Sequence, residues 1–150
     1  MKKLLLLLAV WGLSQLSAKA QSTEEEAIKA TIQQLFDGMR KGDSTMVSAV
    51  FHPTARLQSV FTNKEGKVVV KTDAISGFVK SIGTPHPAVY DERLLSYEIR
   101  IDEQMATAWT PYEFYVGDKF SHAGVDAFQL AKTEKGWQII QITDTRRAKK

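Results

Sequence analysis

The stretch from Ala106 to Thr145 constrains the fold most, because it reads as strands separated only by short turns. Side chains alternate along three segments, Met105–Val116, Lys119–Lys132 and Trp137–Arg146, with the period of two that is typical of β-strands. Gly117-Asp118 suits a two-residue hairpin loop, and Glu134-Lys135-Gly136 suits a turn with glycine at a bulge. The stretch therefore predicts consecutive antiparallel strands.

The two turns also predict which residues face each other. The first places Glu113 opposite His122 and Trp109 opposite Asp126, and the second pairs Asp126 with Asp144 and Phe128 with Ile142. A slip of one residue in either turn would exchange the two faces of the sheet. On this register one face mixes large apolar and ionisable side chains, as the wall of a pocket would: Trp109, Glu113, His122, Asp126, Phe128, Leu130, Ile140, Ile142, Asp144 and Arg146. The other face carries Tyr112, Phe114, Trp137 and Ile139.

The first 20 residues have the pattern of a secretory signal peptide. Lys2 and Lys3 precede an apolar run that is too short for a membrane span, and Ala18-Lys19-Ala20 is a small-x-small cleavage signal. We therefore expect residues 1–20 to be removed after Ala20, and residues 21–150 to form one domain in a secreted or periplasmic protein.

Net charge gives no support for nucleic-acid binding. The chain carries a formal +3, but Lys2, Lys3 and Lys19 belong to the expected signal peptide. Removing these three from the 20 Lys and Arg leaves 17, the same number as the 17 Asp and Glu. The mature chain is therefore close to neutral, and no basic surface is indicated. The basic tail 146–150 is read as a solvated chain end.

Before the sheet stretch, the sequence predicts helices and a strand pair. Glu24–Glu26 favour a helix start near Thr23, and Ile28, Ile32, Leu35, Phe36 and Met39 recur at helical spacing. Further expected elements are a short helix over 44–51 capped by Asp43, strands over 55–62 and 67–71, a helix capped by Asp73, and one strand over 90–102. This order indicates an α+β fold with helices packed on one sheet face.

The whole mature chain resembles the nuclear transport factor 2-like superfamily, and within it the SnoaL-like and lumazine-binding group. The resemblance rests on the segments FDGMRKGDSTMVSAVFHPTARL, MATAWTPYEFYVGDKFSHAGVDAFQL and KGWQIIQITDTRR. It implies a cone-shaped, cystatin-like fold: three N-terminal helices on a curved, mostly antiparallel sheet, a central pocket, and frequent homodimers.

Ketosteroid isomerases share this cone, and aligning VDAFQL places Asp126 where they keep a pocket-facing acid. Their general-base aspartate would fall near Ser59 and their oxyanion tyrosine near Leu35. Because two of the three catalytic parts are missing, the comparison does not imply steroid-type isomerase chemistry.

The candidate ligand-binding residues are those of the mixed face: Trp109, Glu113, His122, Asp126, Phe128 and Asp144. Trp109 and Phe128 would form apolar walls that raise the pKa of Asp126 by desolvation, and Asp126 could share a proton with Asp144. A polar network with a purely structural role is the alternative.

Three functions remain open from the sequence. The first is an exported pocket protein that binds a small, partly apolar, planar organic molecule. The second is a cyclase, dehydratase or isomerase in which His122 is the base and Asp126 or Glu113 orients it. The third is a dimerising module without a ligand, which predicts a filled cone and an interface on the Tyr112 and Trp137 face. No cofactor is expected, and the histidine spacing predicts no metal site.

Overall fold

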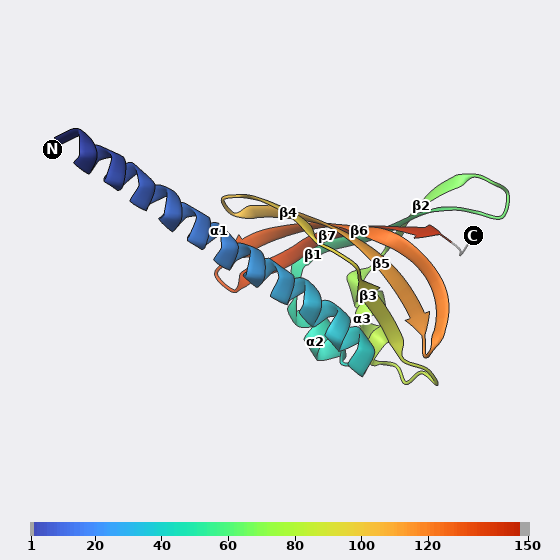
Figure 1. The fold of residues 1–150 in the computed structure, drawn as a ribbon. Coiled ribbons are helices and arrows are strands. Elements are labelled where there is room, and N and C mark those ends of the chain that lie inside the picture. Colours follow the sequence, from blue (N-terminus) through green and yellow to red (C-terminus); the bar gives the residue numbers. More distant parts are fainter. Residues whose placement is uncertain (1, 148–150) are drawn as a thin grey trace.

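The computed structural model describes the backbone of residues 2–147 and the side chains of residues 21–147. In this range the helices lie on one side of a curved, mostly antiparallel sheet (Figure 1). This arrangement confirms the α+β, cone-shaped fold class expected from the sequence. The elements are α1 (Lys2–Lys41), α2 (Ser44–Ala49), β1 (Phe51–Thr62), β2 (Val68–Asp73), α3 (Ile75–Gly83), β3 (Tyr90–Leu94), β4 (Glu98–Asp102), β5 (Met105–Val116), β6 (Lys119–Thr133) and β7 (Gly136–Arg147).

The sheet has the order β2-β1-β7-β6-β5-β3, and β4 pairs with β5 beside β3. Only β1 and β7 pair in parallel among the described strands. The prediction of one strand over 90–102 is wrong, because β3 and β4 pair with successive halves of β5. Pro111 explains the break: its carbonyl accepts a hydrogen bond from the Leu95 N–H at 2.8 Å, but it has no N–H to return.

The hairpin between β5 and β6 begins as its turn predicts and then changes register. Val116 pairs with Lys119 around Gly117, which has a φ of +59°. One residue further on, a β-bulge shifts the pairing, so that Phe114 faces His122 and Tyr112 faces Gly124. Because side chains alternate along a strand, this shift moves the even-numbered residues of β5 to the inner face. The predicted pairs of Glu113 with His122 and of Trp109 with Asp126 are therefore wrong.

The register between β6 and β7 is as predicted near the candidate site. Asp126 pairs with Asp144 and Phe128 with Ile142. Closer to the turn, a second bulge beyond Gln129 brings Ile139 to the inner side, where it is completely buried. The prediction that Ile140 occupies the inner face is corrected to Ile139.

The apolar stripe of α1 packs against the inner face of the sheet. All five predicted stripe residues are buried, and Phe36 meets the Phe128 ring edge-on at 6.3 Å between centroids. Each large apolar side chain buried in this way contributes about 1.5–3 kcal/mol. Glu24 anchors the helix, because its carboxylate accepts hydrogen bonds from Lys132 Nζ at 2.7 Å and Trp137 Nε1 at 2.8 Å. The structure has α1 continuing N-terminal to Thr23, so the predicted helix start there is wrong.

The caps of the two shorter helices differ from each other. Asp43 accepts a hydrogen bond from the Met46 N–H at 2.9 Å, as predicted for an N-cap. The N-cap of α3 is Ala74, which makes no side-chain hydrogen bond, so the predicted cap at Asp73 is wrong. No helix among the described residues has the length and sustained apolarity that crossing a membrane requires.

Gly124 allows β5, β6 and β7 to come together beside the site. A Cβ at this position would lie 1.9 Å from the Thr145 carbonyl oxygen and 2.6 Å from Cε1 of Tyr112. The Tyr112 hydroxyl also donates a hydrogen bond to the Thr145 carbonyl at 3.0 Å. Only glycine therefore lets the tyrosine ring lie over β6 in this position.

We expect Gly124→Ala to lower the free energy of unfolding by more than about 3 kcal/mol, because backbone atoms would have to move apart. Gly77→Ala is the matched control: a Cβ there meets nothing within 4 Å, so alanine in the helix should add about 0.5–1 kcal/mol. Urea unfolding followed by circular dichroism measures both. A loss below about 1 kcal/mol for Gly124→Ala would contradict the close approach.

Candidate functional site

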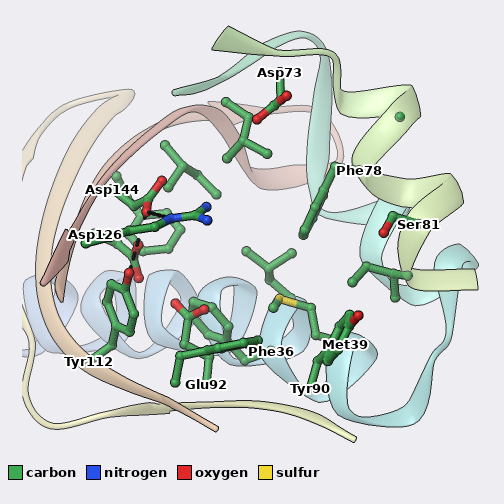
Figure 2. A pocket seen from close by; sticks show the side chains of 18 of the residues that line it. Phe36, Met39, Asp73, Phe78, Ser81, Tyr90, Glu92, Tyr112, Asp126 and Asp144 are labelled. Carbon is green, nitrogen blue, oxygen red and sulfur yellow. Dashed lines mark hydrogen bonds and ion pairs between the residues drawn. The ribbon is translucent and has the colours of Figure 1, made fainter. Parts of the chain in front are cut away.

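A cavity of about 430 Å³ lies between the inner face of the sheet and the helices. This volume falls within the range of small-molecule sites, roughly 300–1,000 Å³. Most of its wall is apolar, and its polar side chains come mainly from β3, β5, β6 and β7 (Figure 2). The lining residues are Leu35, Phe36, Met39, Leu57, Asp73, Ala74, Gly77, Phe78, Ser81, Ile82, Tyr90, Glu92, Tyr112, Phe114, His122, Asp126, Phe128, Ile142, Asp144 and Arg146.

Four of the six candidate residues line this cavity: His122, Asp126, Phe128 and Asp144. Trp109 and Glu113 do not, as the bulge between β5 and β6 requires. Trp109 is 49% exposed and lines a separate hollow of about 440 Å³ on the outer face. Glu113 accepts a hydrogen bond from the Tyr115 hydroxyl at 2.8 Å. The prediction that Trp109 and Glu113 lie on the pocket face is therefore corrected: both lie outside the cavity lining.

Asp144 is buried with its hydrogen-bonding capacity largely used. Its Oδ1 accepts a short hydrogen bond from Ser59 Oγ, and its Oδ2 accepts one from Arg146 Nε at 2.8 Å. The Tyr112 hydroxyl adds a long contact to Oδ2 at 3.5 Å. Arg146 also donates to Ser59 Oγ at 3.0 Å. This carboxylate is paired with a cation, which is the arrangement that makes a buried charge tolerable.

Asp126 lies directly across from Asp144 but has a different environment. It is 4% exposed, and its Oδ2 is the one fully buried side-chain polar atom without a hydrogen-bond partner among the described residues. Burial raises the pKa of Asp126 well above its usual range, and the neighbouring Glu92 and Asp144 raise it further. The predicted rise in this pKa agrees in direction, although Trp109 takes no part in it.

Glu92 is the acidic residue of the cavity that the sequence reasoning missed. Burial raises the pKa of Glu92 to about 7; Asp144 adds to the rise, while Asp126 and Arg146 oppose it. Figure 2 shows its side chain pointing into the cavity below Asp126. The titrations of Glu92 and Asp126 depend on each other, so one proton held by either carboxyl favours the ionised form of the other.

Arg40 on α1 fixes the position of the β3 backbone at Glu92. Its Nη1 donates to Asp91 Oδ1 at 3.1 Å and to the Glu92 carbonyl at 3.3 Å. Pairing of Glu92 with Phe114 then fixes β3 on the edge of β5. The alternation of Tyr90, Glu92 and Leu94 was the signal in the sequence that could have placed Glu92 on the inner face.

His122 is enclosed by aromatic rings rather than paired with an acid. Its ring lies 5.0 Å from the Phe114 ring and 5.8 Å from the Tyr112 ring, between centroids. Its Nδ1 is 3.0 Å from Ser121 Oγ, and this is the only hydrogen bond of the ring among the described residues. Burial lowers the pKa of His122, and Arg146 lowers it further against the opposing effect of Asp144. The neutral imidazole is thus favoured.

The described residues contain no group of three or more His, Cys, Asp or Glu side chains arranged to hold a metal ion. The side chains of Glu92, Tyr112, His122, Asp126, Asp144 and Arg146 form one polar cluster on the cavity wall. Chemically, it can hold a proton on one of two facing carboxyls and accept hydrogen bonds from a molecule in the cavity.

Solved structures of low sequence identity share this fold and define its class, the nuclear transport factor 2-like cone. One such protein with a cystatin-like fold, from Novosphingobium aromaticivorans, has a TM-score of 0.72 at 13% identity, over 89% of each chain. A protein named "putative scytalone dehydratase" from the same organism has a TM-score of 0.69 at 12% identity, over 87% of this chain and 88% of that one. A protein of unknown function from Shewanella baltica has a TM-score of 0.63 at 20% identity, over 85% and 97%.

Within this class, the model of the family described as "Putative lumazine-binding" matches residues 23–143, so the chain belongs to that family. A comparison with functionally curated proteins finds no match. The expected membership of the superfamily and of its lumazine-binding group is confirmed.

The raised pKa of Glu92 predicts how stability depends on pH. Because the folded protein favours protonated Glu92, this residue does not lower the free energy of unfolding below pH 4.5, its ordinary pKa. The free energy of unfolding then falls as the pH rises from 4.5 towards about 7. We expect Glu92→Gln to be more stable than the wild type at about pH 8, by about 1–3 kcal/mol, and equal to it near pH 4. Thermal unfolding across this range measures the difference.

Glu98→Gln, at an exposed position of β4, is the control and should unfold at the same temperature as the wild type. A constant offset between Glu92→Gln and the wild type over the whole range would contradict the titration of a buried carboxyl.

Proposed function

We propose that this protein binds a small, partly apolar, planar organic molecule in the cavity. The observation that supports this most is a buried carboxyl oxygen without a partner, in a cavity of about 430 Å³. A buried polar atom without a hydrogen bond is costly, about 1–3 kcal/mol, and a ligand donor would remove that cost. Membership of the lumazine-binding family also supports a small-molecule ligand.

The shape of the ligand is proposed from the cavity wall. The rings of Phe36, Tyr90, Phe114 and Phe128 line it from α1 and three strands. Tyr90 and Phe114 lie 5.9 Å apart between centroids, and flat aromatic molecules pack favourably against such rings. Phe128 and the two acids Asp126 and Asp144 remain candidate ligand-binding residues, together with His122. Glu92 joins them.

A second candidate function is an enzyme of the dehydratase or isomerase type. The coupled pair of Glu92 and Asp126 favours it, because a carboxyl with a pKa near neutrality can both accept and release a proton. The structure does not support His122 as a base oriented by a carboxylate, since its ring hydrogen bond goes to Ser121. In this second candidate Glu92 is therefore the base.

A dimerising module without a ligand is less well supported, because that hypothesis requires a filled cone and the cone holds a cavity. Its proposed interface is also displaced: Tyr112 and Trp137 are buried inside. Dimerisation itself is compatible with a pocket. We propose that homodimers form through the outer sheet face, where Trp109 and Met105 are 49% and 52% exposed.

Export remains a proposal that rests on the sequence of residues 1–20. The first half of α1 extends beyond the sheet (Figure 1), and Glu24 in the second half is hydrogen-bonded to Lys132 and Trp137 of the sheet. Removal of residues 1–20 would leave this anchor in place.

Gly77 provides a test of the proposed pocket that leaves the acids untouched. It lines the cavity, and a Cβ there meets nothing within 4 Å. We expect Gly77→Leu to occupy part of the cavity and weaken binding at least about 10-fold, while Gly77→Ala keeps most of the affinity. Thermal-shift screening of pterins, flavins, steroids and aromatic amines, alcohols and acids would identify the ligand for calorimetry.

Absence of binding across this panel, or equal binding by wild type and Gly77→Leu, would contradict the proposed pocket. Mass spectrometry of each compound after incubation separates the two candidates: a compound recovered chemically changed would favour the enzyme.

Native mass spectrometry of the protein recovered from the medium or periplasm tests export and assembly together. We expect a dimer of chains that begin at Gln21. Chains that retain Met1 would contradict cleavage, and a monomer at micromolar concentration would contradict the outer-face dimer.

A further inference from the structure

Among the described residues of the polar cluster, one buried carboxyl oxygen has no hydrogen-bond partner. Asp144 is bonded to Ser59 and Arg146, and the Tyr112 hydroxyl donates to the Thr145 carbonyl at 3.0 Å. Two nitrogens of Arg146 are occupied by Asp144 and Ser59. Asp126 Oδ2, by contrast, is buried with no partner among the described residues. Asp126 therefore has no donor among the described residues other than a proton that it can share with Glu92.

The charges of the cavity show the same imbalance. The carboxylate of Asp144 is balanced by Arg146 at 2.8 Å. Neither Glu92 nor Asp126 forms an ion pair in the described part of the chain, although both line the cavity. His122 faces the same space and is favoured as the neutral imidazole. Arg146 offsets part of the repulsion between the two carboxyls, and a shared proton or a bound cation would relieve the rest.

The wall beside these acids suits an organic cation better than an inorganic one. Phe36, Tyr90, Phe114 and Phe128 surround the same space with aromatic rings. Aromatic faces attract organic cations and bury their apolar parts. The described residues do not offer the cluster of ligands that a metal ion requires.

We propose that the ligand is a planar aromatic molecule that carries a basic amine, either an arylalkylamine or a strongly basic amino-substituted heterocycle, whose protonated nitrogen is held between Asp126 and Glu92. The inference rests on the proposed pocket function and specifies its ligand class. The nitrogen supplies N–H donors to Asp126 Oδ2, and its positive charge takes the place of the proton that the two carboxyls would otherwise share. The apolar body of the ligand lies against Phe114 and Phe128.

Binding of such a cation is linked to protons. Entry of the cation drives the shared proton out, so affinity should rise with pH through the titration of Glu92 near 7. Affinity should fall again only where the amine itself loses its proton. A ligand that accepts a hydrogen bond from a protonated acid would show the opposite trend and bind better below that pH. The charged and titratable groups that face the pair are Tyr112, His122, Asp144 and Arg146, with Asp73 at the far wall.

Three matched probes with one aromatic skeleton test the proposal: naphthylmethylamine, naphthylmethanol and naphthoate. Isothermal titration calorimetry at about pH 8 should show the amine binding at least about 10-fold more tightly than the alcohol, with naphthoate weakest. Repeating the amine titration in buffers of different ionisation enthalpy should reveal proton release on binding. Lowering the pH to about 5 should weaken the amine and leave the alcohol unchanged.

Asp126→Asn and Glu92→Gln keep the shape of the site and remove one acid each. In either variant the preference for amine over alcohol should fall at least about 5-fold. Asp73→Asn is the control, because Asp73 lines the cavity but is paired with Lys71 at 2.8 Å. Near-ultraviolet circular dichroism confirms that each variant is folded, and the two acids lie on different strands, so failure of one variant leaves the other informative.

The outcomes distinguish failure of the proposed pocket function from failure of the proposed cationic ligand. If the alcohol or naphthoate binds as tightly as the amine, the pocket function stands and the cation inference is overturned. If the amine preference survives in both variants, the acids are not its cause and the inference is likewise overturned. If no probe binds and Gly77→Leu changes nothing in the wider screen, both the pocket function and the inference fail.

Discussion

One extra residue in β6 decides which side chains line the cavity. The bulge between Phe114 and Tyr115 changes the pairing of β5 with β6 by one position, and every side chain of β5 beyond it changes face. Tyr112 and Phe114 thereby enclose His122 on the inner face. Gly124 makes this arrangement possible, because no other residue leaves room for the Tyr112 ring. The polar cluster therefore depends on two local features of β6.

These features explain how far the sequence predicts the fold and the site. The α1 stripe, the Asp43 cap and the pairing of Asp126 with Asp144 follow from periodicity and turn chemistry, which are local. The bulge has no such local signal, because nothing around Ser121 distinguishes a regular ladder from one with an extra residue. Glu92 was missed for a different reason: its strand ends where Pro111 interrupts the ladder, so its partner on β5 could not be inferred from a turn.

Asp126 and Asp144 show that position on a sheet does not determine the behaviour of an acid. They lie opposite each other on neighbouring strands, and both are buried. Asp144 has an arginine and a serine as partners, while Asp126 has another acid near it and an open cavity beside it. The first arrangement stabilises a charge in the folded protein. The second arrangement makes ionisation of Asp126 unfavourable, and a bound molecule that donates a hydrogen bond or carries a positive charge can offset this.

Gly77 links the capacity of the cavity to the stability of α3. Glycine is a poor helix residue, yet it stands here at the wall of the cavity, where a Cβ would meet nothing within 4 Å. Alanine would strengthen the helix with little loss of space, whereas a larger helix-favouring residue would strengthen it and also reduce the space for a ligand. The size of the residue at this one helical position thus sets how much of the cavity wall beside α3 is open to a ligand.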